Sequence, residues 1–173
     1  MILIFEIFRR DYAMGNLEKR TQEVVFQTCL LLIKHFRNLI EFQNETNQSR
    51  LGYNSRVFEH MLHKEDSFVF LGESEKAATA TSRCRLEHVV PCSYMIDELD
   101  KLIKRNEYSD EELATALQKN WKVARITLEE AKYLDAKLGA GLKNKMPDGW
   151  DFMVGRPEER LEVAGIKLLP KQA

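Results

Sequence analysis

The sequence predicts an α+β fold in which a long N-terminal amphipathic helix and additional helices accompany a few short strands. Three observations carry this prediction. Apolar residues recur at helical spacing over Leu17–Phe42. Short apolar runs end at Gly72 and at Pro91, residues that interrupt a strand. Two capping boxes, which begin at Ser109 and at Thr127, mark the starts of further helices.

The composition indicates an ordinary globular protein. The 173 residues are 44% hydrophobic and 31% charged, and the formal net charge is -1. A near-neutral chain gives no global sign of nucleic-acid binding, although a local basic groove is compatible with it. The three cysteines, Cys29, Cys84 and Cys92, are an odd number and indicate reduced thiols, so we expect a cytoplasmic protein.

The N-terminal part, residues 1–54, is predicted to be a strand and a helical arm. Met1–Phe8 is apolar except for one glutamate and is too short to span a bilayer, so no membrane association is expected. We expect it to form a β-strand, or to lie upstream of a start at Met14. The apolar face of the helix over Leu17–Phe42 serves either as core or as the seam of a homodimer. A loop is expected over Gln43–Asn54.

The middle of the chain alternates short elements. We expect a short helix over Ser55–His63, a buried strand over Ser67–Gly72 and an exposed, mobile loop over Glu73–Ser82. A strand over Arg83–Val90 ends at the following proline.

The second half is predicted as helix, helix, strand and helix, in that order. The expected ranges are Tyr94–Arg105, Asp110–Gln118, Trp121–Ile126 and Leu128–Leu138. The run Met146–Gly149 indicates a tight turn anchored by Trp150, and the tail ends in an apolar run, Val163–Leu169.

One pentapeptide, Glu87-His88-Val89-Val90-Pro91, lies at the end of the strand over Arg83–Val90. With the helical insert, strand and capped helix that follow, it resembles the HNH nuclease superfamily of the stand-alone bacterial or phage type. The resemblance covers roughly residues 83–138. It implies a ββα-metal (HNH-like) core within residues 55–173, two antiparallel strands, and a metal-dependent endonuclease that hydrolyses phosphodiester bonds in DNA.

The resemblance also implies roles for individual residues. Glu87 would bind a divalent cation, Mg²⁺ or Mn²⁺, and His88 would be the general base that activates water. Asn120 corresponds to the family's middle asparagine, which braces the loop that carries the histidine. The third position falls on Ala131, where the family has His or Asn. Glu130 is the nearest carboxylate, and we expect it to converge with Glu87 and His88 if it has taken over as ligand.

Each of these residues has a plainer interpretation. The capping box that begins at Thr127 already explains Glu130, and Asn120 fits the cap of a turn. The basic residues Arg83, Arg85, Lys122 and Arg125 either contact DNA phosphates or cover ordinary solvated strand faces. Two other functions therefore stay open: a degenerate HNH scaffold that binds nucleic acid or protein, and an unrelated, mostly helical interaction protein.

Overall fold

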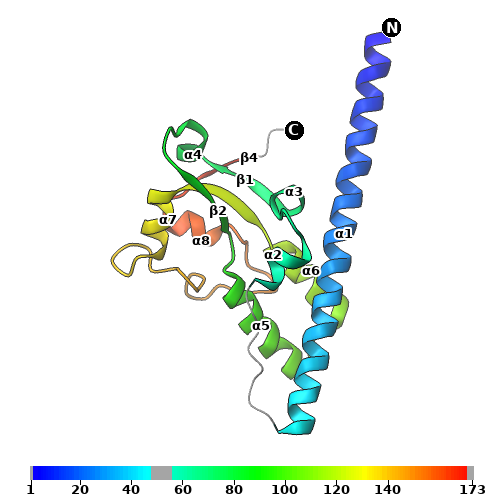
Figure 1. Ribbon diagram of the computed structural model, residues 1–173, viewed down its shortest axis with the longest axis vertical. Coiled ribbons are helices and arrows are strands. Elements are labelled where there is room, and N and C mark those ends of the chain that lie inside the picture. The colour runs from blue at the N-terminus through cyan, green and yellow to red at the C-terminus, as the bar shows by residue number, and fades with distance from the viewer. Residues whose placement is uncertain (1, 48–55, 171–173) are drawn as a thin grey trace.

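The computed structural model describes residues 2–47 and 56–170. A small four-stranded sheet, several short helices and one long N-terminal helix make up the fold, which confirms the predicted α+β class (Figure 1). In chain order the elements are α1 (Ile2–Thr46), α2 (Val57–Met61), α3 (Asp66–Val69), β1 (Phe70–Ser74), α4 (Glu75–Thr79), β2 (Cys84–His88), α5 (Cys92–Arg105), α6 (Asp110–Asn120), β3 (Val123–Thr127), α7 (Leu128–Asp135), α8 (Glu159–Val163) and β4 (Leu168–Pro170).

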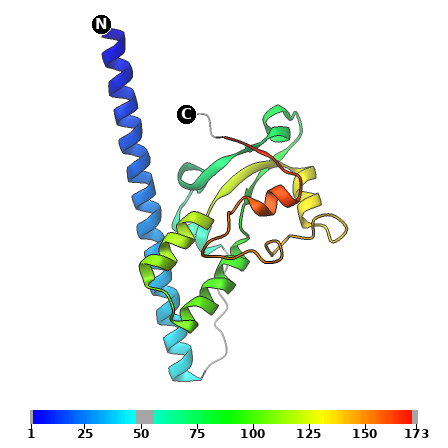
Figure 2. The same ribbon diagram turned by 180° about the vertical axis from the view of Figure 1, so that it is seen from behind.

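Helix α1 is longer than expected at both ends. The strand predicted over Met1–Phe8 is wrong, because α1 begins at Ile2. A helix satisfies its backbone hydrogen bonds within the segment, whereas a strand needs a neighbour. The loop predicted over Gln43–Asn54 is wrong for its first four residues, because α1 continues to Thr46. Residues 48–54 of the predicted loop lie outside the described residues. Figures 1 and 2 show α1 running beside the body and extending beyond it.

The predicted apolar face of α1 is core. Its buried residues share one apolar cluster with side chains of α5 and α6. The predicted N-terminal part, residues 1–54, and the predicted domain, residues 55–173, therefore share a single core. The α1 members are Val25, Cys29, Leu32, Ile33, Phe36 and Ile40. Within the described helices, none is long and apolar enough to cross a membrane.

The sheet has the strand order β2-β3-β1-β4. Strands β2 and β3 pair antiparallel, as predicted, with Cys84 opposite Thr127 and His88 opposite Val123. Strand β1 lies parallel to β3, and β4 lies antiparallel to β1. A second apolar cluster, with Ala124 and Ile126 of β3 at its centre, packs the sheet against α7 and α8.

The region over residues 67–82 differs from the prediction. Asp66–Val69 is a helical turn, so the strand starts at Phe70 and runs through the predicted stop at Gly72 to Ser74. The predicted mobile loop contains α4, because the Ser74 hydroxyl accepts a hydrogen bond from the Ala77 amide and caps the helix. The Ala77 side chain is buried, which ties α4 to the body.

Both predicted capping boxes are confirmed. Ser109 with Glu112 starts α6, and Thr127 with Glu130 starts α7. Helix α7 ends at Asp135, three residues before the predicted end at Leu138.

The segment after α7 is anchored by Trp150. Its indole Nε1 donates to the Arg156 carbonyl at 2.8 Å, and its ring packs edge-on against Tyr94 and Phe152. Gly149 adopts a φ of 80°, which a side chain would disfavour. These contacts hold the segment around Trp150 against the start of α5.

Candidate functional site

The predicted acid–histidine pair lies at the end of β2, opposite Ala124 and Val123 of β3. Neighbouring side chains of a regular strand point to opposite faces. Glu87 accordingly contacts Arg160 and Arg85, whereas the His88 ring contacts Glu65. The two predicted catalytic side chains therefore belong to separate clusters and do not face one cleft.

The His88 ring is held by a carboxylate. Nε2 of His88 lies 3.0 Å from Oε1 of Glu65, the residue before α3. The Trp121 indole Nε1 donates to the same oxygen at 2.8 Å, and Trp121 is fully buried. Because a carboxylate only accepts hydrogen bonds, Nε2 of His88 is the donor to Glu65, and Nδ1 is the ring nitrogen outside this contact. A carboxylate that holds one nitrogen of a histidine ring is the arrangement found beside a general base.

Cys92 follows this pair at the start of α5. Burial, and next the negative charge of Glu65, raise the pKa of the Cys92 thiol far above its ordinary value. The thiol is therefore protonated at neutral pH, and a cysteine nucleophile activated by His88 is not supported.

Glu87 lies in an arginine–carboxylate cluster, formed by Arg85, Glu87, Asp135 and Arg160. Its Oε1 accepts from Nη1 of Arg160 at 3.1 Å, and its Oε2 lies 2.6 Å from Nη2 of Arg85. Asp135, the last residue of α7, lies 3.3 Å from Arg85 and 3.9 Å from Arg160. Two guanidinium groups thus neutralise two carboxylates.

Arg160 of α8 is the fully buried member of this cluster. Its Nη1 also donates to the His88 carbonyl at 2.8 Å. Nε donates to the Leu142 carbonyl at 2.8 Å, and Nη2 donates to the Lys143 carbonyl at 3.3 Å. Burial lowers the pKa of Arg160, and the charge of Glu87 opposes this effect. An arginine in such surroundings stays charged.

Glu130 lies at the other end of the strand pair. Its Oε2 accepts from the Thr127 amide at 2.9 Å and from the Ser74 hydroxyl at 2.7 Å. Thr127 is opposite Cys84, four residues from His88 along β2, which corresponds to about 13 Å of strand. The expected convergence of Glu130 with Glu87 and His88 is therefore wrong. The cap requires the carboxylate at the start of α7.

The predicted metal ligands do not fit a divalent cation. A carboxylate ligand needs a free oxygen lone pair directed at the ion. Both oxygens of Glu87 face guanidinium groups, and Glu130 lies at the far end of the strands. Among the side chains that the structure describes, residues 15–47 and 56–169, no group of three or more His, Cys, Asp or Glu is arranged to hold a metal.

Asn120 braces a loop, although a different one from that expected. Its Nδ2 donates to the Phe152 carbonyl at 2.7 Å, and the side chain is fully buried at the end of α6. Its Oδ1 has no hydrogen-bond partner among the described residues. Asn120 therefore positions the segment that contains Trp150, not the one that carries His88.

The four predicted phosphate-binding residues do not form one free basic surface. Arg85 belongs to the arginine–carboxylate cluster, and Arg125 pairs with Glu73 at 2.7 Å. Burial lowers the pKa of Lys122. Of the four, Arg83 alone is both exposed and outside the ion pairs found in the described part of the chain.

Sequence reasoning missed Glu65, Asp135 and Arg160. Glu65 lies 23 residues before His88, and Arg160 lies 73 residues after Glu87. No local spacing links such pairs. Asp135 had a weak signal, because it lies one helical turn after Ala131, on the same side of α7.

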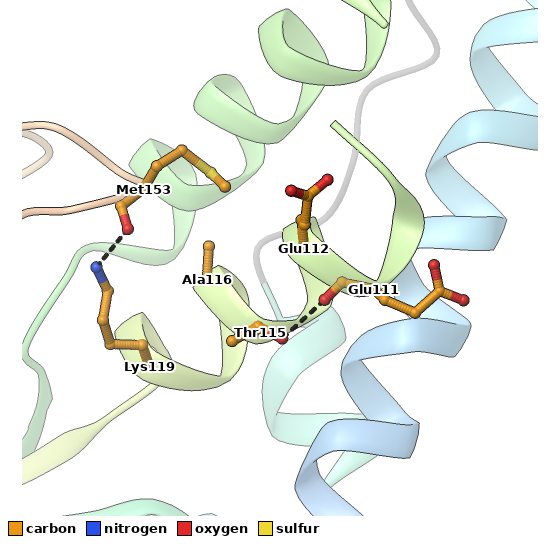
Figure 3. A pocket seen from close by; sticks show the side chains of 6 residues that line it. All are labelled: Glu111, Glu112, Thr115, Ala116, Lys119 and Met153. Atoms are coloured by element: carbon orange, nitrogen blue, oxygen red, sulfur yellow. Dashed lines mark hydrogen bonds between the residues drawn. The ribbon is translucent and has the colours of Figure 1, made fainter. Parts of the chain in front are cut away.

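A shallow cavity of about 340 Å³ lies elsewhere, between α6 and Met153 (Figure 3). Its cation, Lys119, donates to the Met153 carbonyl at 2.9 Å, and burial lowers its pKa. The remaining lining residues are Glu111, Glu112, Thr115 and Ala116. None of the residues predicted for chemistry lines this cavity.

No protein-family model matches the chain, and comparisons with curated proteins and with solved structures found no match.

The first prediction concerns Glu130 as a cap. Glu130→Gln keeps an acceptor oxygen for Thr127 and Ser74, so we expect little change in the free energy of unfolding. Glu130→Ala leaves buried donors unpaired and should cost about 1–3 kcal/mol, measured by urea denaturation. Mn²⁺ binding, measured by calorimetry, should be the same for both variants and the native chain. A selective loss of Mn²⁺ binding in Glu130→Gln would restore the ligand role.

The second prediction concerns the buried cluster. Glu87→Ala leaves the Arg160 charge uncompensated and should lower the free energy of unfolding by about 3 kcal/mol. Glu73→Ala is the matched control, because Glu73 pairs with Arg125 at the surface and should cost less than about 1 kcal/mol. Equal, small effects of the two substitutions in urea denaturation would contradict a structural role for Glu87.

Proposed function

We propose that the chain is a DNA-binding module on an HNH-like scaffold in which a buried guanidinium takes the place of the metal ion. The observation that carries this proposal is a set of four exposed lysines with no ion pair in the described part of the chain, beside the arginine–carboxylate cluster. They are Lys132, Lys137, Lys143 and Lys145.

The scaffold half of the proposal is supported by topology. The antiparallel strands β2 and β3 are followed at once by α7, which is the order of elements in a ββα unit. Arg160 contacts Glu87 and lies near Asp135, so a carboxylate of the first strand and one of the helix share a cation. This cation is part of the protein. All the Arg160 nitrogens already have protein partners, so it offers no open position for water or phosphate.

The binding half of the proposal is supported by charge. Residues 132–145 contain four lysines and one acid, Asp135, and that acid is paired with arginines. The Lys143 carbonyl accepts a hydrogen bond from Arg160, which holds the loop after α7 beside β2. Arg83 adds a further exposed cation, and its carbonyl accepts from the first amide of α7, which holds it beside that helix. Unpaired lysines on a fixed surface can neutralise the phosphates of DNA without reading its sequence.

One observation favours a second candidate, the metal-dependent endonuclease. His88 is only partly buried, and the Glu65 carboxylate holds its ring in one orientation. A histidine with this support is suited to act as the general base toward water. In His88 one ring nitrogen contacts Glu65 and the ring stays partly exposed to solvent, which a purely structural histidine does not require. The endonuclease therefore has its own test below.

The third prediction tests DNA binding. Replacement of Lys143 and Lys145 by alanine should weaken binding to duplex DNA and lower the slope of log K against log salt by about 0.9 for each phosphate that the variant no longer neutralises. Lys167→Ala is the control, because this exposed lysine precedes β4, at the opposite edge of the sheet from β2. Fluorescence anisotropy at several salt concentrations measures both quantities. An equal loss of affinity in the control, or unchanged affinity in the double variant, contradicts the proposal.

The fourth prediction separates the two candidates. We expect the native chain to bind supercoiled plasmid without nicking it, in Mg²⁺ or in Mn²⁺. The endonuclease instead requires nicking that falls on the order of a hundredfold or more in His88→Ala. His60→Ala provides the matched control, because His60 is an exposed histidine of α2 outside the contacts of His88 and Glu65. Nicking that persists in His60→Ala and disappears in His88→Ala would establish the endonuclease.

A further inference from the structure

Helix α1 carries a second stripe, with three exposed apolar residues, that the body covers only in part at Val24 and Thr28. Leu17, Leu31 and Phe42 are 68%, 61% and 44% exposed. At 100° per residue these three positions fall within about 40° of one another around the helix. The core-facing residues, such as Cys29 and Phe36, lie on a different face and are fully or almost fully buried.

This outer stripe follows a heptad spacing. Steps of four and three residues connect its members, which is the pattern that keeps one side chain set facing a neighbouring helix in a coiled coil. The outer stripe consists of Leu17, Thr21, Val24, Thr28, Leu31, His35, Asn38 and Phe42. Its two ends, Leu17 and Phe42, are apolar, and so are Val24 and Leu31, whereas the other four positions are polar.

Part of α1 also lacks support from the body. Residues 15–20 are all exposed, and the buried face begins at Val25. Figures 1 and 2 show this end of the helix extending away from the sheet. Helices gain most of their stability from packing of an apolar face, so an unsupported segment of this length calls for a partner.

We propose that the outer stripe pairs with the same stripe of a second copy, in an antiparallel coiled coil. In this arrangement Phe42 packs against Leu17 of the second copy, and Leu31 packs against Thr28. Val24 then meets His35, and Thr21 meets Asn38. Each contact occurs twice, because the dimer has a twofold axis. The large apolar residues thus fill the two ends and the centre of the interface.

The charges beside the stripe favour the antiparallel direction. Arg20, Gln27, Lys34 and Glu41 line one flank at heptad spacing and are exposed. In an antiparallel pair Arg20 meets Glu41 of the second copy, and Lys34 meets Gln27. A parallel pair would instead place Arg20 beside Val25, which carries no charge. In the described part of the chain, neither Arg20 nor Glu41 has another ionic partner.

Sedimentation equilibrium over a wide range of concentrations tests the pairing. The 20.2 kDa chain should sediment as a dimer. Leu31→Lys should weaken the dimer on the order of a hundredfold or more, because two central leucine contacts are replaced by charges. Its far-ultraviolet circular dichroism and monomer stability should match those of the native chain, since Leu31 is mainly exposed. Leu138→Lys, at a fully exposed leucine outside α1, should leave the dimer unchanged.

A charge exchange tests the direction. Arg20→Glu and Glu41→Arg should each weaken the dimer, and the double variant should restore it. A native chain that stays monomeric at every concentration overturns the proposal. A dimer that survives Leu31→Lys, or a double variant as weak as the two single variants, overturns it as well. DNA binding by Lys143 and Lys145 is measured separately, so either proposal can fail without the other.

Discussion

The buried charge of Arg160 is the constraint on which the β2 edge of the molecule depends. A guanidinium without solvent contact needs protein acceptors for its donors, because an unpaired buried charge is strongly destabilising. Arg160 places four of its five N–H groups on the carbonyls of His88, Leu142 and Lys143 and the carboxylate of Glu87. These acceptors belong to the end of β2 and to the loop after α7. One side chain of α8 therefore fixes both segments.

This constraint limits the chemistry that the edge can perform. A divalent cation in a hydrolytic site keeps positions for water and substrate, and it exchanges those ligands during the reaction. Arg160 neutralises Glu87 as a cation would, but its hydrogen bonds to protein groups leave it nothing to exchange. The hydrogen bonds from Arg160 to backbone carbonyls still present the adjoining lysines on a fixed loop. A surface of this kind suits binding better than catalysis.

Local signals in the sequence were predictive, and distant ones were not. The capping boxes at Ser109 and Thr127 were confirmed, because a cap involves residues three positions apart. The same local rule gives the correct account of Glu130, whose carboxylate is needed at the start of α7. The antiparallel pairing of β2 with β3, which the resemblance to the HNH superfamily implied, is also present. By contrast, Arg160 reaches Glu87 across 73 residues, and only the folded chain brings them together.

Helix α1 shows a different limit. Its core-facing residues and its outer stripe occupy adjacent positions, such as Leu32 beside Leu31 and Phe36 beside His35. The two stripes lie side by side on the helix, because adjacent positions differ by 100°. Each stripe repeats every three or four residues, so the spacing in the sequence is the same for both. The sequence therefore indicates an amphipathic helix and a wide apolar surface, but it does not divide that surface between two partners. The body of the protein makes the division when it covers Leu32 and Phe36. What remains exposed on the adjacent face includes Leu17, Leu31 and Phe42, which one further helix can cover.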